Sequence, residues 1–242
     1  GVIALNATPY AIAAVLIGLI RRSAGTIPAP NVTAVPARAG FVGEWIGGLR
    51  LVLTSRAVLV VFVATAVVLL GDSMFFALLA PFVDQNFTDA AVIFGLITAA
   101  RGAGGLLGGV LTGPLGQVLP VWQRLGGTPV VAGGLLALFV LVPRIPIVLA
   151  ASVLLGIAAV VWGASIQTTV QAKVPNAYLG RVFGSFGTTN AAATTLGSAA
   201  AAMMGEPHGV VAVLLAASGL YVASGLLIYL TFPRQASELW PP

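Results

Sequence analysis

Apolar runs alternate along the chain with short polar connections, and each run is close to the ~20 residues that a helix needs to cross ~30 Å of hydrocarbon. The runs lie at residues 1–20, 57–82, 90–111, 125–142, 146–170, 182–204 and 209–232. They are continuously apolar and do not alternate residue by residue, which favours helices over the strands of a membrane barrel. The pattern predicts an all-α, polytopic membrane bundle of seven transmembrane helices. Because the connections are short, we expect consecutive helices to be antiparallel neighbours.

The segment between the first two runs lacks this pattern. It begins with SAGTIPAPNVTAVPARAG, whose prolines, glycines and alanines are typical of a linker. In the following FVGEWIGGLRLVLTSR, Phe41, Trp45 and Leu49 fall near one helical face, which predicts a helix in the membrane interface. We therefore divide the chain into a helix at 1–22, a linker with an interfacial helix at 23–56, six transmembrane helices at 57–232 and a tail at 233–242.

The charge pattern gives the orientation. Only 7% of the residues are charged, against about 25% in a soluble domain, and 59% are hydrophobic. The net charge of +5 therefore does not indicate nucleic-acid binding, since excess Lys and Arg in a membrane chain marks cytoplasmic connections. With Arg21 and Arg22 on the cytoplasmic side, nine basic residues fall on that side and only Arg144 falls on the other. We expect 21–56, 171–181 and the tail to be cytoplasmic.

Four segments carry a resemblance to a known family. QAKVPNAYLGRVFGSFG, at 171–187, has the pattern Q-x-x-V-P-x-x-x-x-G-R-V-F. ALNATPYAIAAVLIGLIRR, GLRLVLTSRAVLVVF and ARGAGGLLGGVLTGPLG agree with it in order and spacing. Together they resemble drug- and siderophore-exporter-like members of the major facilitator superfamily. In that family the first pattern is a cytoplasmic turn between the tenth and eleventh helices, and its residues here would be Lys173, Pro175, Gly180 and Arg181.

The resemblance implies the C-terminal half of a twelve-helix fold, in which two six-helix halves surround a central cavity. The run at 1–20 would then be the last helix of a missing N-terminal half, and the protein would lie in a bacterial inner membrane. The runs at 125–142 and 209–232 would be the ninth and twelfth helices, which face lipid in this family.

Asp72 and Arg101 are the charged residues inside the predicted spans. An ionised carboxylate is costly in hydrocarbon, so Asp72 must face water or a partner, or carry a proton. An arginine stays charged and needs water, a carboxylate, backbone carbonyls or an anionic substrate. At ~1.5 Å per residue, Asp72 lies ~24 Å from Arg56, in the outer third, and Arg101 lies ~20 Å below the outer face. We therefore favour an Arg101 that faces the cavity over one that pairs with Asp72, since a direct salt bridge would need helix tilt and a long reach.

Two roles are open for each of these charges. They would serve ion coupling or selection of substrate charge if they face a transport cavity. Otherwise Asp72 would be a structural hydrogen-bonding residue near the outer interface, and Arg101 would extend toward the cytosol.

The run at 182–204 is the most polar. At 100° per residue, one side carries Ser185, Thr188, Thr189 and Thr195, and the opposite side carries Asn190, Thr194 and Ser198. Each stripe could line a polar cavity or join helices through small residues. The resemblance favours cavity lining by the first stripe together with Gln167. Trp162 would either stack on a substrate or pack in the core.

Glycines in the run at 90–111 predict close helix packing. They are spaced as Gly104-x-x-x-Gly108 and Gly105-x-x-x-Gly109, and no P-loop lysine follows them.

These features predict a fragment of a secondary active transporter that exports amphipathic small molecules by alternating access, driven by an ion gradient. Its expected partners are the lipid bilayer, the missing N-terminal half and a small-molecule substrate. We expect no cofactor, no metal ion and no nucleic acid. The alternative is a seven-helix membrane scaffold without transport activity. An enzyme is disfavoured because carboxylates and histidines are few and scattered.

Overall fold

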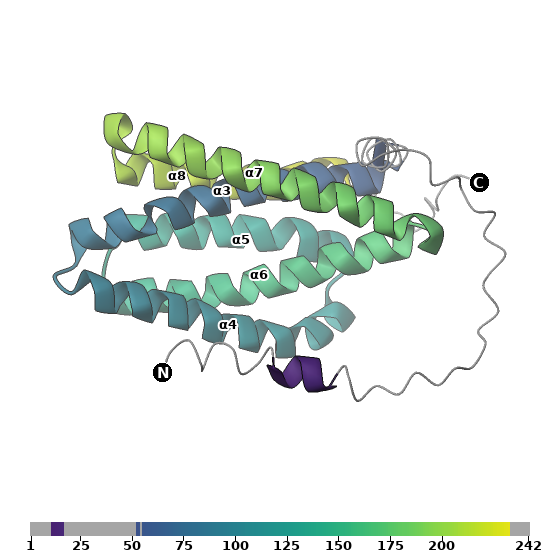
Figure 1. Ribbon diagram of the computed structural model, residues 1–242, viewed down its shortest axis with the longest axis horizontal. Helices are drawn as coiled ribbons and strands as arrows, with labels where there is room; N and C mark the ends of the chain where they lie inside the picture. The colour runs from purple at the N-terminus through teal and green to yellow at the C-terminus, as the bar shows by residue number, and fades with distance from the viewer. Residues whose placement is uncertain (1–10, 17–51, 54, 233–242) are drawn as a thin grey trace. The chain divides into compact units, whose positions relative to one another are not determined.

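The structure is a computed structural model that describes residues 11–16, 52–53 and 55–232. Residues 55–232 form a series of long helices (Figure 1): α3 (Arg56–Asn86), α4 (Ala90–Val118), α5 (Val121–Leu141), α6 (Ile145–Lys173), α7 (Leu179–His208) and α8 (Val210–Thr231). A 3-10 turn, η1 (Asn176–Tyr178), lies between α6 and α7. The described residues contain no strand. The prediction of an all-α bundle is confirmed.

Three predicted elements fall largely outside the described residues. Of the first span, at 1–20, residues 11–16 are described and helical, and they belong to a compact unit separate from the bundle. The interfacial helix within 23–56 is described only at its end, and the tail at 233–242 is not described.

Five of the described helices, α3, α4, α5, α6 and α8, are long and apolar enough to cross a membrane. The remaining long helix, α7, has 30 residues and is long enough, but its serines, threonines and asparagine make it more polar. Both observations agree with the sequence pattern, which identified 182–204 as the most polar span.

Four of the described helices, α3, α4, α6 and α7, extend beyond their predicted C-terminal ends. α3 has 31 residues and is therefore ~46 Å long, well beyond the ~30 Å of the hydrocarbon layer. It continues through Pro81, and α4 continues through Pro114 to Val118 rather than ending near residue 111. Apolar character marks where a helix meets hydrocarbon, whereas the backbone hydrogen bonds continue into the interface.

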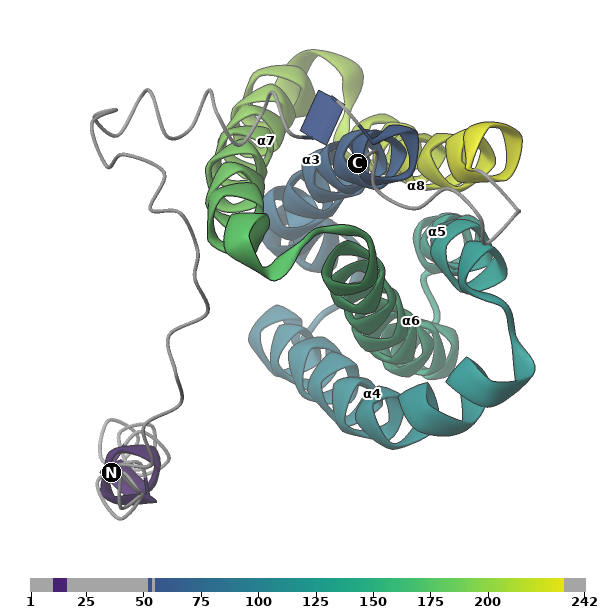
Figure 2. The ribbon, with the colours of Figure 1, turned by 90° about the vertical axis from the view of Figure 1, so that its right-hand side faces the viewer.

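The prediction that consecutive helices are neighbours is wrong for most pairs, and α5 with α6 is the pair that fits it. α4 packs chiefly against α6, α5 against α8 and α6, and α3 against α7 and α8, while α3 and α4 touch only over a short stretch. Figure 2, which views the helices end-on, shows α6 between α4 and α5. A short connection joins two helix ends but does not hold the helices together along their length, and side-chain shape decides the remaining contacts.

Small residues explain the closest contact, between α4 and α6. A Cβ on Gly104 would overlap the backbone of Val153, and one on Gly108 would lie 2.9 Å from the carbonyl oxygen of Ile157. A Cβ on Gly109, by contrast, would have no neighbour within 4 Å. The Gly104–Gly108 spacing is thus a packing motif, as predicted, and Gly109 does not take part.

Charges are distributed unevenly between the two ends of the bundle. The α3 start, the α4–α5 connection and the α6–α7 connection lie at one end and carry Arg56, Arg124, Lys173 and Arg181, with no carboxylate among the described residues there. In the α6–α7 connection Lys173 ends α6, Pro175 precedes η1, and Gly180 and Arg181 lie in the first turn of α7. The cytoplasmic location of this end stays a prediction.

Candidate functional site

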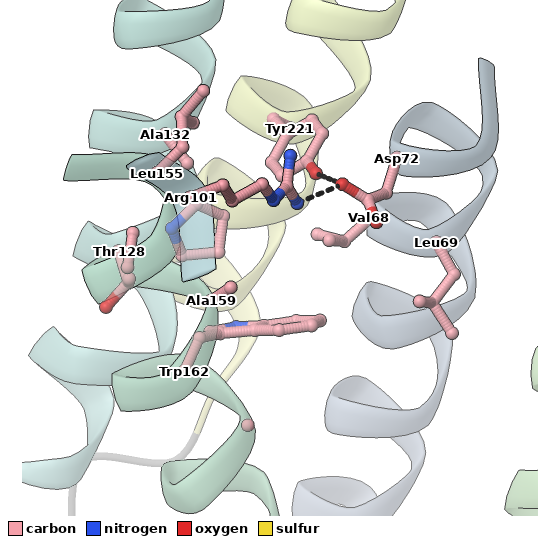
Figure 3. Close-up of a pocket in the computed structure, with 13 residues that line it drawn as sticks. Val68, Leu69, Asp72, Arg101, Thr128, Ala132, Leu155, Ala159, Trp162 and Tyr221 are labelled. Atoms are coloured by element: carbon pink, nitrogen blue, oxygen red, sulfur yellow. Dashed lines mark hydrogen bonds and ion pairs between the residues drawn. The ribbon is translucent and has the colours of Figure 1, made fainter. Parts of the chain in front are cut away.

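The two charges inside the helices pair with each other. Nη2 of Arg101, on α4, donates a hydrogen bond to Oδ1 of Asp72, on α3, at 2.7 Å. The hydroxyl of Tyr221, on α8, donates to the same oxygen at 2.5 Å. Figure 3 shows both donors converging on the carboxylate, so that one side chain joins three helices.

The prediction that Asp72 and Arg101 lie at different depths is therefore wrong. The depth of Asp72 was counted from the cytoplasmic face and that of Arg101 from the outer face, on the assumption of a layer ~30 Å thick. Because α3 is ~46 Å long, the two counts do not share one scale. Measured from the turn that joins the helices, Asp72 lies 14 residues before Asn86 and Arg101 lies 11 residues after Ala90. The remaining difference of three residues is only ~4.5 Å along the axis, well within the reach of an arginine.

Close backbone packing brings these side chains together. At Gly71, beside Asp72, a Cβ would lie 3.0 Å from the carbonyl oxygen of Ala217 and 3.3 Å from the ring of Tyr221. α3 and α8 therefore approach closely at the level of the carboxylate. On the other side, Gly156 of α6 packs directly on the backbone carbonyl of Arg101 and fixes α4 there.

The side chains around the ion pair offer more favourable interactions to the guanidinium of Arg101 than to the carboxylate of Asp72. The side chains of Arg101 and Asp72 are 17% and 24% exposed. The guanidinium also lies over the rings of Phe76 and Phe75, with its Cζ 4.6 Å and 5.6 Å from their centroids, which adds cation–π attraction. Both hydrogen bonds to Asp72 end on Oδ1, and Oδ2 accepts none from the described residues. The second oxygen remains open to a proton or to a ligand.

The pair forms part of the wall of a cavity of about 220 Å³. Five helices contribute its lining: Val68, Leu69, Asp72, Arg101, Thr128, Pro129, Ala132, Leu155, Ala158, Ala159, Trp162, Gly163 and Tyr221. The indole of Trp162 lies across one side of the cavity (Figure 3), and its Nε1 donates to the carbonyl oxygen of Leu125 at 3.2 Å. Trp162 is therefore both a packed core residue and a flat apolar surface in the cavity.

The predicted cavity stripe on α7 does not line this cavity. Ser185 is buried, Thr188 and Thr189 are half-buried, and Thr195 is exposed, as is Gln167 on α6. The Thr188 hydroxyl donates to carbonyl oxygens one turn back, at Gly184 and Ser185, and the Thr195 hydroxyl to that of Ala191. Their role in a larger cavity stays a prediction.

Tyr221 is the residue of the candidate site that the sequence did not reveal. The helix that carries it was expected to face lipid, yet Tyr221 is only 8% exposed and points toward Asp72. Its neighbours Ser218 and Ser224 are also buried and donate to backbone carbonyls of α5 and α3. Polar residues at 218, 221 and 224 mark one face of α8, and this spacing was the available signal.

The comparison with known families agrees with this architecture. Residues 3–239 match the major facilitator family described as transmembrane secretion effector. The searches of curated proteins and of solved structures found no match.

Proposed function

Because the chain belongs to the major facilitator family described as transmembrane secretion effector, it is a multi-pass membrane protein of a transporter family, and we propose that it is one half of an exporter driven by an ion gradient. The observation that carries the proposal is the half-buried Asp72–Arg101 pair in the wall of a cavity, where the accepting oxygen of Asp72 also receives a hydrogen bond from Tyr221. Ionisable residues within membrane spans are costly, and they are retained where they serve ions or substrates.

Protonation of Asp72 is the proposed coupling step. The ionised carboxylate balances the charge of Arg101 and holds α3, α4 and α8 together. A proton on Asp72 removes that balance, and the guanidinium then requires another anion or water. Binding of a proton to Asp72 and binding of an anionic group to Arg101 would thereby be linked, which connects the gradient to the position of the helices.

The lining of the cavity suits amphipathic molecules. Most of its residues are apolar, Trp162 offers a flat surface for stacking, and Arg101 is the single cation among the residues that form its wall. A substrate with an apolar body and a polar or anionic group would satisfy both parts. We propose this substrate class for export.

Transport would proceed by alternating access against a second six-helix half. α4 buries few of its residues, and Leu106 and Val110 on it are 79% and 76% exposed. α7 likewise exposes Thr195 and Leu196. We propose that the second half covers part of these faces, that the polar stripe of α7 lines the shared cavity, and that the basic end of the bundle lies in the cytoplasm of a bacterial cell. A scaffold role is less well supported, because a scaffold has no need of an ion pair in the wall of a cavity.

Replacing Asp72 with asparagine should abolish the dependence of export on the proton gradient, because an amide cannot take up the proton. The measurement is efflux of a fluorescent amphipathic compound from vesicles that contain the complete transporter, with and without a proton uncoupler. Asp84→Asn, near the end of the same helix, removes an equal charge and should leave the dependence intact. Unchanged uncoupler sensitivity of Asp72→Asn would refute the coupling role.

Cysteine labelling tests the α7 stripe in the same complete transporter. A cysteine at Thr188 or Thr195 should react with a water-soluble maleimide, and a bound substrate should slow the reaction severalfold. A cysteine at Thr194, an exposed threonine on the opposite stripe, serves as the matched control and should react equally with and without substrate. Equal labelling at all three positions would assign the stripe to helix packing.

A further inference from the structure

A second cavity opens on the side of the bundle, apart from the ion pair. It measures about 530 Å³, and its walls are the end of α4, one face of α5, the middle of α6 and the end of α8. It lies toward the basic end of the bundle, which Figure 2 faces. Most of its lining is aliphatic, and Val131 and Leu154 in its wall are 58% and 47% exposed. We call it the lateral groove.

Arg124 is the single charged residue that lines the lateral groove. Its Nε donates to the carbonyl oxygen of Leu119 at 3.2 Å, and its Nη1 donates to Oγ of Ser165 at 3.4 Å. No carboxylate pairs with it among the described residues, and its Nη2 has no hydrogen-bond partner among them. The guanidinium is thus held in place by neutral groups and keeps donor capacity for an anion.

The groove has the length of one lipid leaflet. Its α5 wall runs from Arg124 through Thr128 and Val131 to Leu135, a single stripe that spans 11 residue steps, or ~16 Å. On the antiparallel α6, Ser165 lies beside Arg124, and Leu154 lies 11 residues away from it at the far end. Half of a ~30 Å hydrocarbon layer is ~15 Å. The charge of Arg124 therefore lies at one end of an apolar groove whose length matches the thickness of the hydrocarbon region of one leaflet.

Two aromatic residues mark the same end of the groove. Trp122 and Tyr229 line it and meet edge to face, with ring centroids 5.7 Å apart. Tryptophan and tyrosine gather at the level of lipid headgroups, where one part of the ring is apolar and the other is polar. Trp122 and Tyr229 thus indicate the same headgroup level as Arg124.

We propose that the lateral groove binds an anionic phospholipid, with its phosphate on Arg124 and an acyl chain between α5 and α6. Charge complementarity selects the headgroup, because this end of the bundle carries cations and no carboxylate among the described residues. Basic pockets between transmembrane helices are known to hold such headgroups. Thr128 and Ala158 line both the groove and the ion-pair cavity, so the lipid would contact the wall of the candidate site. This lipid site stands whether or not Asp72 carries the coupling proton.

Native mass spectrometry of the purified chain in neutral detergent tests the proposal. Phosphatidylglycerol and phosphatidylcholine with identical chains are titrated in parallel, and we expect phosphatidylglycerol to bind more tightly. Arg124→Gln should weaken phosphatidylglycerol about tenfold, the loss expected for one charge-assisted hydrogen bond, and should weaken phosphatidylcholine less, because the choline cation already offsets the charge of its phosphate. Arg56→Gln removes an exposed cation from the same end and should change neither. Equal binding of the two lipids, or equal effects of the two variants, would overturn the proposal.

Two further arms need no variant. Dihexanoyl phosphatidylglycerol keeps the headgroup but shortens the chains, and it should bind at least tenfold more weakly if the groove holds an acyl chain. Inorganic phosphate at millimolar concentration should not displace the long-chain lipid. Displacement by phosphate would assign Arg124 to a soluble anion rather than to a membrane lipid.

Discussion

Replacing Arg101 with methionine should lower the free energy of unfolding by about 3 kcal/mol, because it leaves the half-buried carboxylate of Asp72 without its counter-charge. Methionine keeps most of the length of the apolar stem and loses the guanidinium together with its cation–π contacts to Phe75 and Phe76, so the lost charge dominates the effect. The measurement is equilibrium unfolding of the chain in mixed micelles, followed by circular dichroism. The double variant Asp72→Asn/Arg101→Met removes both charges and should recover most of the loss.

Arg144→Met is the matched control. Arg144 is exposed at the start of α6, so its replacement should change the free energy of unfolding by less than about 0.5 kcal/mol. A double variant as unstable as Arg101→Met alone would show that Arg101 stabilises the bundle through packing. The ion pair would then be incidental to stability.

The sequence predicted the elements of the fold well because hydrophobic length is a local property. Each of the spans from 57 to 232 corresponds to one helix, and even the polar character of α7 is visible in its serines and threonines. Helix ends were less well predicted, since the ends of α3 and α4 lie beyond the apolar stretch and continue through Pro81 and Pro114. Nothing in hydropathy marks where a helix ends after it leaves the hydrocarbon.

The site was half predicted. Asp72 and Arg101 are conspicuous because a charge in an apolar run needs a reason, and both line the cavity. Their pairing was missed because depth was measured from opposite faces. Tyr221 was missed because a tyrosine is ordinary in a membrane helix, and only the packing of α8 against α3 brings it to Asp72. Which helices pack together depends on non-local shape, which a single sequence does not display.

A few glycines determine how closely the helices pack, and those between α4 and α6 explain how the ion pair is positioned. Arg101 belongs to α4, the least buried of the long helices, and its main neighbour is α6. Gly156 of α6 packs on the carbonyl of Arg101 itself, and Gly104, one turn further along α4, packs on Val153. The α4–α6 contact therefore determines how far the guanidinium reaches toward α3.

Gly156→Ala should lower both the stability of the protein and its transport rate. Its new methyl group would overlap the carbonyl oxygen of Arg101, so α4 must move away from α6, at a cost of about 1–3 kcal/mol. The shift draws Arg101 away from Asp72, and we expect proton-driven export in the complete transporter to fall at least tenfold. Thermal unfolding in micelles and efflux from vesicles measure the two effects.

Gly109→Ala on α4 is the control, because a methyl group there meets nothing within 4 Å. Alanine is also the better helix former by up to about 1 kcal/mol, so this variant should be as stable as the parent or more stable. A cost at Gly109 equal to that at Gly156 would mean that glycine is needed for helix flexibility rather than for close approach. The position of Arg101 would then depend on bending of α4, and the α4–α6 contact would not be what aims the charge at Asp72.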